Sequence, residues 1–239
     1  MVDIRQQDLT RPMYVNPHFA ERELPVLHDT IEAVRFGLLV LCADGPLAAH
    51  VPFVLHRADG PYGTLVAHVA RNDPLARHLG DGHEALAIFS GPRAYVSPRW
   101  YPNGGLPTYN FVAVHGYGHP RPLEDRDAVL IHLAELVEVH EEPFPDPWLL
   151  ASAHQDDVAD LLPHIAAFTL EIEAIQGKRK LSQNRAAEDR DGVIRGLRER
   201  GRDDDRAIAE AMAVHPYASS EAQGLMALPR GFRHDEGPG

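Results

Sequence analysis

Apolar residues recur at helical spacing in four segments of the chain. In Glu21–Val34 they stand three and four positions apart, and in Asp125–His140 they share one face opposite Glu and Asp residues. Two further helices are predicted for Asp189–Arg200 and Asp203–Met212, joined at Gly201. The chain therefore carries amphipathic helices both in its first half and near its end.

Shorter apolar or alternating segments, separated by Gly- and Pro-containing turns, predict strands instead. The predicted strands are Phe36–Cys42, Leu47–His56, Tyr62–Val69, Glu84–Ser90, Tyr109–Gly118 and Ile165–Ile175, with a short helix over Asn72–Leu79. Several short strands with such turns favour a β-barrel to which helices are added, which is an α+β fold that is mainly β.

Composition narrows the class of protein. The 239 residues are 44% apolar and 24% charged, which is ordinary for a globular protein. No run of eighteen apolar residues occurs and the N-terminus has no apolar signal core, so we expect no membrane partner and a cytoplasmic location. Cys42 is the only cysteine, which excludes an internal disulfide and a Cys-rich zinc site.

The charge balance argues against direct binding of nucleic acid. Asp and Glu outnumber Lys and Arg by 35 to 23, giving a net charge of −12, whereas DNA binding needs clustered cations. One basic block stands out, KRKLSQNR over Lys178–Arg185, and no helix-turn-helix pattern flanks it. This block can hold an anionic ligand; the alternative is a solvated loop with helix-capping residues.

Histidine is abundant, with 15 residues, but most of them lack a second ligand at helical spacing. His78, His83, His132, His154 and His215 are therefore expected to be surface or core residues. Without a HExxH or two-His-one-carboxylate spacing, we expect no zinc or iron site formed by protein side chains alone. The chain also has no GxSxG, GxGxxG or GxxxxGK[ST] motif, which argues against a serine hydrolase and against Rossmann or P-loop folds.

Several sequence blocks resemble a known family. They are RPMYVNPHF (Arg11–Phe19), AHVARNDP (Ala67–Pro74), ALAIFSGPRAYVSPRWYP (Ala85–Pro102), LPTYNFVAVHGYG (Leu106–Gly118) and GKRKLSQNR (Gly177–Arg185). From Arg11 to about Ala213 the chain resembles the PaiB-like family of FMN-binding negative transcriptional regulators. The resemblance implies a split β-barrel of the flavin-reductase type, which forms a homodimer and binds flavin or haem at the subunit interface.

The domain organisation follows from this resemblance and from the helix pattern. We expect an FMN-binding split β-barrel over residues 11–185, with peripheral helices and with C-terminal helices packing on it over residues 186–213. Residues 1–10 are predicted to be flexible and residues 214–239 to be disordered.

A histidine in a predicted strand is the candidate cofactor ligand. In a strand, Ala67 and Val69 lie on the face opposite His68. If they point into apolar packing, the imidazole is free to reach a cofactor, and one neutral imidazole is enough to bind haem iron. The resemblance implies that His68 is the axial ligand of haem b, with His50 and His115 as alternatives. His68 could instead hydrogen-bond a neighbouring strand or the edge of FMN.

Other candidate site residues come from the same blocks. Arg71 and Asn72, at a strand end, could hold a phosphate or a haem propionate. The remaining predicted cofactor-binding residues, which supply rings, hydroxyls, amides and a cation, are Tyr95, Ser97, Trp100, Tyr101, Asn110, Ser182, Gln183, Asn184 and Arg185. The aromatic residues could equally form a dimer interface. Tyr109 stands where the family usually has tryptophan, which indicates a specialised member.

The chain also resembles a branch of this family, the haem-dependent piperazate synthases, in length and blocks. That resemblance implies a small amino-acid-like substrate, N5-hydroxy-L-ornithine, cyclised to L-piperazate by N–N bond formation, with Thr108, Tyr109 and Lys180 handling protons. One alternative is a PaiB-type regulator that binds FMN without catalysis, with Arg71, Ser97 and Lys180 at the flavin phosphate. Another is a split-barrel flavin or haem oxidoreductase.

Overall fold

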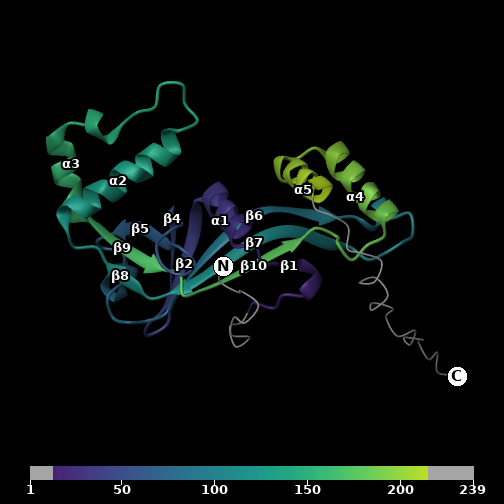
Figure 1. Cartoon of the computed structure of the whole chain (residues 1–239), viewed down its shortest axis with the longest axis horizontal. Coiled ribbons are helices and arrows are strands. Elements are labelled where there is room, and N and C mark those ends of the chain that lie inside the picture. Colours follow the sequence, from purple (N-terminus) through teal and green to yellow (C-terminus); the bar gives the residue numbers. More distant parts are fainter. Residues whose placement is uncertain (1–12, 215–239) are drawn as a thin grey trace, which may run out of the picture. The chain divides into compact units, whose positions relative to one another are not determined.

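The computed structural model describes residues 13–214, which form helices and strands (Figure 1). The α-helices are α1 (Leu24–Val34), α2 (Arg126–Glu141), α3 (Gln155–Leu161), α4 (Ala187–Arg200) and α5 (Asp203–Val214). Short 3-10 helices include η3 (Pro74–His78) and η4 (Pro98–Trp100). Within this range no helix has both the length and the apolar character needed to cross a membrane.

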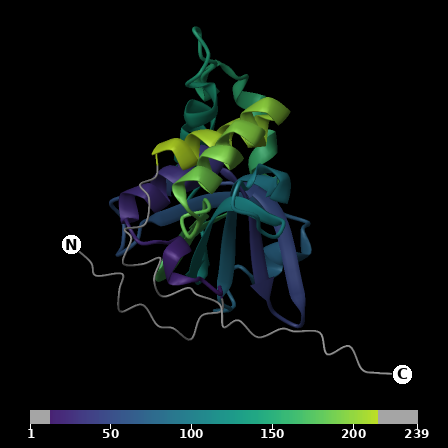
Figure 2. The ribbon, with the colours of Figure 1, turned by 90° about the vertical axis from the view of Figure 1, so that its right-hand side faces the viewer.

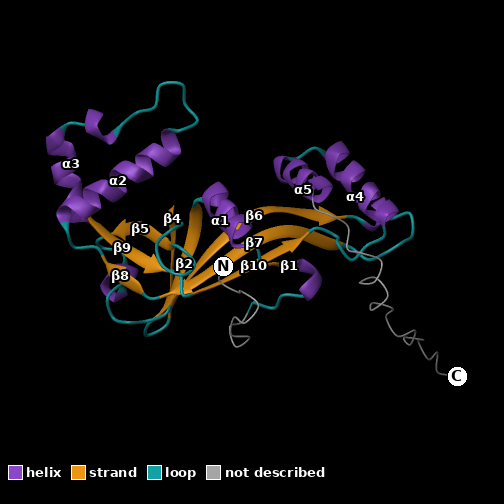
Figure 3. Ribbon diagram, viewed as in Figure 1, coloured by secondary structure: helices purple, strands orange, loops and turns teal. Residues whose placement is uncertain are grey.

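The strands form two sheets, drawn in orange in Figure 3. They are β1 (Ala20–Glu21), β2 (Phe36–Cys42), β3 (Pro46–Pro52), β4 (Val54–His56), β5 (Thr64–Ala70), β6 (Ala85–Val96), β7 (Thr108–Gly118), β8 (Pro120–Pro122), β9 (Ile165–Glu171) and β10 (Ala174–Lys180). One sheet has the order β1-β10-β7-β6-β2-β3 and the other the order β4-β5-β9-β8. The prediction of an α+β, mainly β fold with added helices is confirmed.

The chain divides into two compact units. Among the described residues, the first unit comprises 13–92 and 111–179, and the second comprises 93–110 and 180–214. Helices α4 and α5 thus belong to the second unit, together with η4. The predicted disordered tail 214–239 begins one residue too early, because Val214 is the last residue of α5. Residues 215–239, the expectation for His215 and the predicted flexible segment 1–10 lie outside the described residues.

Alternating apolar side chains from both sheets form the core of the first unit. Its most completely buried members, each at most 2% exposed, include Leu39, Leu41, Leu65, Ala67, Phe89, Phe168 and Leu170. Leu27 and Ile31 of α1 complete this core, and each is 1% exposed. Burying each such side chain contributes roughly 1.5–3 kcal/mol relative to leaving it exposed.

Two predicted strands prove to be two strands each, because the chain changes sheets within them. The predicted strand Leu47–His56 breaks at Phe53, between β3 of one sheet and β4 of the other. The Phe53 ring is buried, with its centroid 5.3 Å from that of Phe89, and its N–H donates to the Arg35 carbonyl at 2.9 Å. Phe53 therefore has a hydrogen bond for its N–H and a buried position for its ring, although it belongs to neither strand.

The second break falls in the predicted strand Ile165–Ile175. Here β9 ends at Glu171 and β10 begins at Ala174 in the other sheet. The Ile172 N–H donates to the Gly63 carbonyl at 2.9 Å, and the Glu173 N–H to the Tyr117 carbonyl at 2.8 Å. These hydrogen bonds replace the ladder while the chain crosses between the sheets.

Smaller differences concern element ends and types. The predicted first helix loses its first turn, since Ala20 and Glu21 pair with β10 as strand β1. The predicted helix over Asn72–Leu79 is the 3-10 helix η3, and the predicted strand Glu84–Ser90 extends to Val96. Helix α3 and the short strand β8 were not predicted, because neither presents a periodic apolar face.

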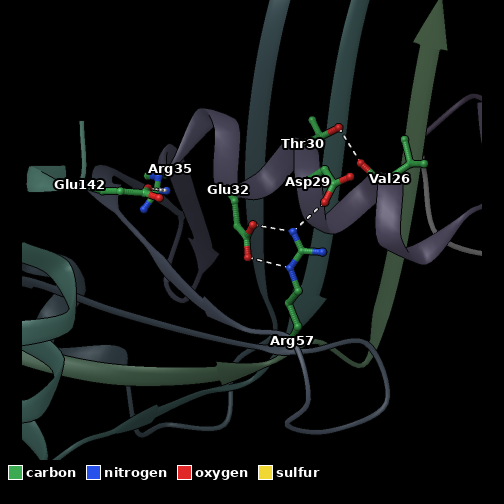
Figure 4. Close-up of polar contacts among 7 residues, drawn as sticks. All are labelled: Val26, Asp29, Thr30, Glu32, Arg35, Arg57 and Glu142. Carbon is green, nitrogen blue, oxygen red and sulfur yellow. Dashed lines mark hydrogen bonds and ion pairs between the residues drawn. The ribbon is translucent and has the colours of Figure 1, made fainter. Parts of the chain in front are cut away.

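An arginine fixes α1 beside the chain that leaves β4 (Figure 4). Arg57 donates through Nε to Glu32 at 2.7 Å, and through one terminal nitrogen to Asp29 at 2.7 Å and to Glu32 at 2.5 Å. The hydrogen bond from Arg57 holds the pKa of the Glu32 carboxyl below its usual range. Since these groups are largely exposed, they orient α1 more than they stabilise it.

In the second unit, α4 and α5 lie side by side in both views (Figures 1 and 2). Gly201 joins them with φ of 69°, a left-handed conformation that glycine adopts without strain, as predicted for this junction. On the other side of α4, a Cβ at Gly196 would lie 2.3 Å from the Trp100 ring. The glycine therefore lets the indole rest directly on the helix.

A glycine at the end of β7 gives a test of how closely the sheets approach. A Cβ at Gly118 would lie 2.1 Å from the Glu171 carbonyl oxygen, whereas nothing lies within 4 Å of one at Gly45. Gly118→Ala is therefore expected to lower the free energy of unfolding by about 1–3 kcal/mol or more, as overpacking does. Gly45→Ala is the control and should unfold like the unmodified protein in urea; equal midpoints for the two variants would contradict the predicted clash.

Candidate functional site

Strand β5 directs His68 away from the core. Ala67 and Val69 are buried in the core cluster, as the alternation predicted, and His68 points to the opposite face. There its Nδ1 lies 3.0 Å from Nε2 of His132 on α2, and the two rings meet edge to face. His68 thus faces a helix that carries a second, buried imidazole.

The contact continues along α2 to a third histidine and a carboxylate. One helical turn beyond His132, the Glu135 carboxylate lies 3.0 Å from Nε2 of His56. His56 ends β4, the neighbour of β5 in the sheet. We call His56, His68, His132 and Glu135 the histidine network.

Burial keeps two of these imidazoles neutral. It lowers the pKa of His68 below its ordinary value. Burial, together with the neighbouring His68 and His56 rings, lowers the pKa of His132 to about 4. At neutral pH both rings are therefore uncharged, and the uncharged imidazole is the form that binds a metal ion.

The hydrogen bond between His68 and His132 also constrains the protons on the two rings. His132 Nδ1 is buried and has no hydrogen-bond partner among residues 13–214. If His68 Nδ1 donates, His132 Nε2 accepts, and His68 Nε2 is left with a lone pair. Among the described residues nothing hydrogen-bonds to that nitrogen, so it is the atom of the network that can serve as a ligand.

The other two candidate iron ligands lie in different surroundings. His50 is exposed and stacks on Phe36, with the ring centroids 6.0 Å apart. His115 is half-buried; burial lowers its pKa, and its Nδ1 has no partner in the described part of the chain. Neither ring is oriented by a second imidazole as His68 is.

Arg71 and Asn72 follow β5 and are exposed. The Arg71 N–H donates to the His164 carbonyl at 2.8 Å, which fixes the chain at this point. Its side chain borders a cavity of about 590 Å³, which Arg126 and several apolar residues also line. Glu124 lines the same cavity and Asn72 does not, and the role of Arg71 in holding an anion stays a prediction.

In the second unit, the three predicted proton-handling residues lie where β7 begins and β10 ends. Lys180 Nζ donates to Thr108 Oγ1 in a very short contact. The next residue, Tyr109, is 56% exposed, and its ring centroid lies 5.8 Å from that of Tyr95. The structure thus brings Lys180 and Thr108 into contact, whereas Tyr109 contacts Tyr95, and the proton-handling role of all three stays a prediction.

A cavity of about 370 Å³ adjoins the two tyrosines. Its other lining residues are Arg93, Ala94, Arg200, Arg202, Asp204 and Asp205. Arg200 is held by Asp205 through two hydrogen bonds, at 2.7 and 2.5 Å, and this pairing lowers the pKa of Asp205. Arg202 lies close enough to Asp205 for its charge to help lower the pKa of that carboxyl, and its backbone N–H donates to Asp205 Oδ2 at 3.3 Å.

Three predicted cofactor-binding residues form a buried polar network instead. Asn110 and Ser182 are at most 3% exposed and hydrogen-bond to each other, with the amide nitrogen 2.9 Å from the hydroxyl. The Gln183 side chain accepts the Leu181 N–H at 2.7 Å. Arg190 of α4, 1% exposed, donates to the Leu181 carbonyl at 2.9 Å. These groups satisfy one another and join the end of β10 to α4.

The remaining predicted residues have varied surroundings. Arg185 lies over the Tyr101 ring, 4.5 Å from its centroid, in a cation–π contact, and burial raises the pKa of that tyrosine. Ser97 caps η4 by accepting the Arg99 N–H at 3.3 Å. Trp100 packs on α4 as described above, and Asn184 is exposed.

The sequence did not reveal two features of the first unit. His132 was expected to be an ordinary surface or core residue, yet it is the partner of His68; its place beside Val129 and Leu133 on the buried face of α2 was the available signal. His78 and His83 were expected to have no second ligand, and this was wrong, because they lie with Asp81 in one group.

The depressed pKa of His132 gives a pH prediction. A histidine whose pKa is lowered on folding stabilises the fold above its unfolded pKa of about 6.5, and this stability is lost as the pH falls towards the folded value. Since each pKa unit corresponds to about 1.4 kcal/mol, the free energy of unfolding should fall by about 3 kcal/mol between pH 6.5 and 4 because of His132.

Urea titrations across this pH range would measure the effect. His132→Gln, which cannot titrate, should flatten the dependence by that amount. His140→Gln on the same helix is the control, since His140 is exposed. Equal pH dependence in His132→Gln and the unmodified protein would contradict the prediction.

Comparison with known proteins agrees with this fold. The family model described as "Putative FMN-binding domain" matches residues 13–174. "Protease synthase and sporulation protein PAI 2" of Bacillus subtilis (strain 168) is 30% identical over 201 residues, covering 84% of this chain and 96% of that protein.

Two solved structures are similar in fold. The flavocytochrome Anf3 from Azotobacter vinelandii has a TM-score of 0.51 at 16% identity, covering 70% of this chain and 72% of that chain. The conserved hypothetical protein Rv2991 from Mycobacterium tuberculosis has a TM-score of 0.50 at 11% identity, covering 70% of this chain and 91% of that chain. With the match over residues 13–174 and the relationship to PAI 2, the chain belongs to the PaiB-like family of FMN-binding split β-barrel proteins.

Proposed function

We propose that this chain binds haem b through His68 and cyclises N5-hydroxy-L-ornithine to L-piperazate. The observation that carries the haem assignment is the contact between His68 Nδ1 and His132 Nε2 at 3.0 Å. Proteins commonly orient a histidine ligand through a hydrogen bond from the ring nitrogen that does not bind the metal, and this bond also makes the ligand a stronger base. His132 would do this for His68.

Two further properties of His68 suit it to bind haem iron. His68 is kept neutral by burial, which is the state an axial ligand needs. Its Nε2 carries no hydrogen bond within residues 13–214, so binding there breaks no existing contact. His50 has no such support, since its ring only stacks on an exposed phenylalanine.

The proposed reaction is redox-neutral. The α-amine nitrogen forms a bond to N5, the N5–O bond breaks, and the hydroxyl leaves as water after taking up a proton while the amine loses one. Bound haem iron would supply the Lewis acid that polarises the N–O bond. This chain's residues would then bind the substrate, orient it and move the two protons.

Lys180 and Thr108 are the proposed proton-handling pair. The ammonium already donates to the threonine hydroxyl, which orients it. A proton held at Lys180 Nζ would pass to the departing hydroxyl. Tyr109, 56% exposed, lines the cavity of about 370 Å³, and its hydroxyl is the proposed partner of the α-amine. Three arginines, Arg93, Arg200 and Arg202, line this cavity together with Asp204 and Asp205, and an excess of one positive charge supports binding of a substrate carboxylate.

A second candidate is a PaiB-type regulator that binds FMN without catalysis. The family match over residues 13–174 and the likeness to PAI 2 favour it. Arg71, beside a cavity of about 590 Å³, would then contact the flavin phosphate. Ser97 supports this candidate less, because its hydroxyl already caps η4. A haem or flavin oxidoreductase would share these cofactor contacts.

The absorption spectrum separates the cofactors, because haem gives a Soret band near about 400 nm and flavin gives paired bands near about 375 and 450 nm. We expect a Soret band in the purified protein and its loss in His68→Ala, since the axial ligand is gone. His140→Ala, an exposed histidine of α2, is the control and should keep the band. A flavin spectrum, or a full Soret band in His68→Ala, would overturn the assignment.

Turnover of N5-hydroxy-L-ornithine tests the proton-handling pair. Lys180→Met should lower kcat by about 10²–10⁴-fold while haem remains bound, as loss of a general acid does. Lys178→Met is the matched control on the same strand, because Lys178 Nζ donates to the Tyr14 carbonyl at 3.0 Å. If both variants turn over substrate at the unmodified rate, Lys180 is not the acid; if haem-loaded protein yields no piperazate, the substrate assignment fails.

A further inference from the structure

The loop between η3 and β6 brings together two imidazoles and a carboxylate. Ligand atoms from His78, Asp81 and His83 all lie within 4.8 Å of one another. His78 Nδ1 and Asp81 Oδ2 are 3.0 Å apart, and the centroids of the two imidazole rings are 6.1 Å apart. We propose that these three side chains form a binding site for a divalent transition-metal ion such as Zn²⁺.

The backbone holds the three side chains in this arrangement before any ion binds. Leu75 and Leu79 are at most 2% exposed and anchor the segment in the core on both sides of His78. Gly82 has φ of 77°, which turns the chain so that His83 returns towards His78. Since nothing lies within 4 Å of a Cβ at Gly82, the glycine serves the backbone conformation and not a close contact.

The donor set selects the class of ion. Two nitrogen ligands disfavour Ca²⁺ and Mg²⁺, which prefer oxygen, and favour Zn²⁺, Co²⁺, Ni²⁺ and Cu²⁺. Around a tetrahedral Zn²⁺ at 2.0–2.1 Å, ligand atoms lie about 3.3 Å apart, so the three side chains must close slightly. The Asp81 side chain, 50% exposed, is free to rotate for this purpose.

Three protein ligands leave one position of a tetrahedral ion for water. The site shares no residue with the histidine network. All three ligands come from six consecutive residues, so the ion would bind to a single loop and fasten the end of η3 to the start of β6. The inference is therefore independent of the proposed haem chemistry.

Another histidine–carboxylate contact in the unit supplies a control. His119 Nδ1 lies 2.8 Å from Glu173 Oε1, with both side chains 41% exposed. Within residues 13–214, however, the only group of three such ligands is the one on the η3–β6 loop. A histidine with one carboxylate partner should bind a divalent ion far more weakly than two histidines and a carboxylate.

The test is calorimetric titration of untagged full-length protein with ZnCl₂, together with the visible spectrum of the Co²⁺ complex. We expect one ion per chain, a Co²⁺ spectrum typical of nitrogen and oxygen ligands, and a higher melting temperature with Zn²⁺. His83→Ala and His78→Ala should each weaken binding by at least about 100-fold, because each removes a ligand and not an outer contact.

His119→Ala is expected to bind like the unmodified protein. Asp81→Asn, which keeps the shape of the side chain and removes its charge, should bind measurably more weakly than the unmodified protein. Absence of stoichiometric binding, or unchanged affinity in His78→Ala and His83→Ala, would overturn the proposal. Because the readouts are Zn²⁺ affinity and the Co²⁺ spectrum, failure here leaves the haem assignment standing, and the reverse also holds.

Discussion

The alternation of side chains along β5 determines what the first unit can do chemically. Leu65, Ala67 and Val69 must face the core, because together with the other sheet they exclude water from it. His68 is consequently forced to the opposite face. A shift of one residue in the pairing of β5 with β9 would bury the imidazole in an apolar core and leave Ala67 facing α2.

Helix α2 determines the surroundings of His68, because it covers the face of the sheet on which this residue lies. Val129 and Leu133 pack against Ile165 and Ala167 of β9, and this contact removes water from around His132. Two imidazoles in such surroundings are stable only if they are neutral and hydrogen-bonded. The carboxylate of Glu135 lies one turn further along, beside the more exposed His56. The carboxylate therefore lies beside the more exposed histidine, and the two neutral imidazoles lie on the covered face of the sheet.

Periodicity predicted the elements but could not locate the points where the chain changes sheets. The apolar pattern runs through Phe53 without interruption because that residue is itself in the core. The same is true at Ile172, which is fully buried. Where the chain passes from one sheet to the other, its backbone changes hydrogen-bond partners but its side chains stay buried. The pattern of apolar residues therefore does not reveal the change. The long helix α2 and the junction at Gly201, by contrast, depend on local signals and were predicted.

Site prediction from the sequence was limited by a different ambiguity. Amides and hydroxyls that satisfy one another look the same in a sequence as those that hold a ligand, and Asn110 with Ser182 illustrates this. His78 and His83 show the converse. Asp81 stands three residues after His78 and two before His83, but the three side chains meet only because the chain turns at Gly82. Contacts set by loop geometry are therefore missed by arguments from periodicity.

Most residues of the basic block, Lys178–Arg185, make contacts within the fold. Its first cation, Lys178, donates to a backbone carbonyl, and Arg179 lies 4.0 Å from Glu21. Ser182 and Gln183 are buried, since the chain must satisfy its polar groups where it passes from β10 into α4. Lys180 donates to a side-chain hydroxyl, that of Thr108, on the neighbouring strand β7. A hydrogen bond between two side chains can be exchanged for one to a ligand without opening the backbone ladder of a strand or a helix, and this is the physical basis on which we propose Lys180 as the proton donor.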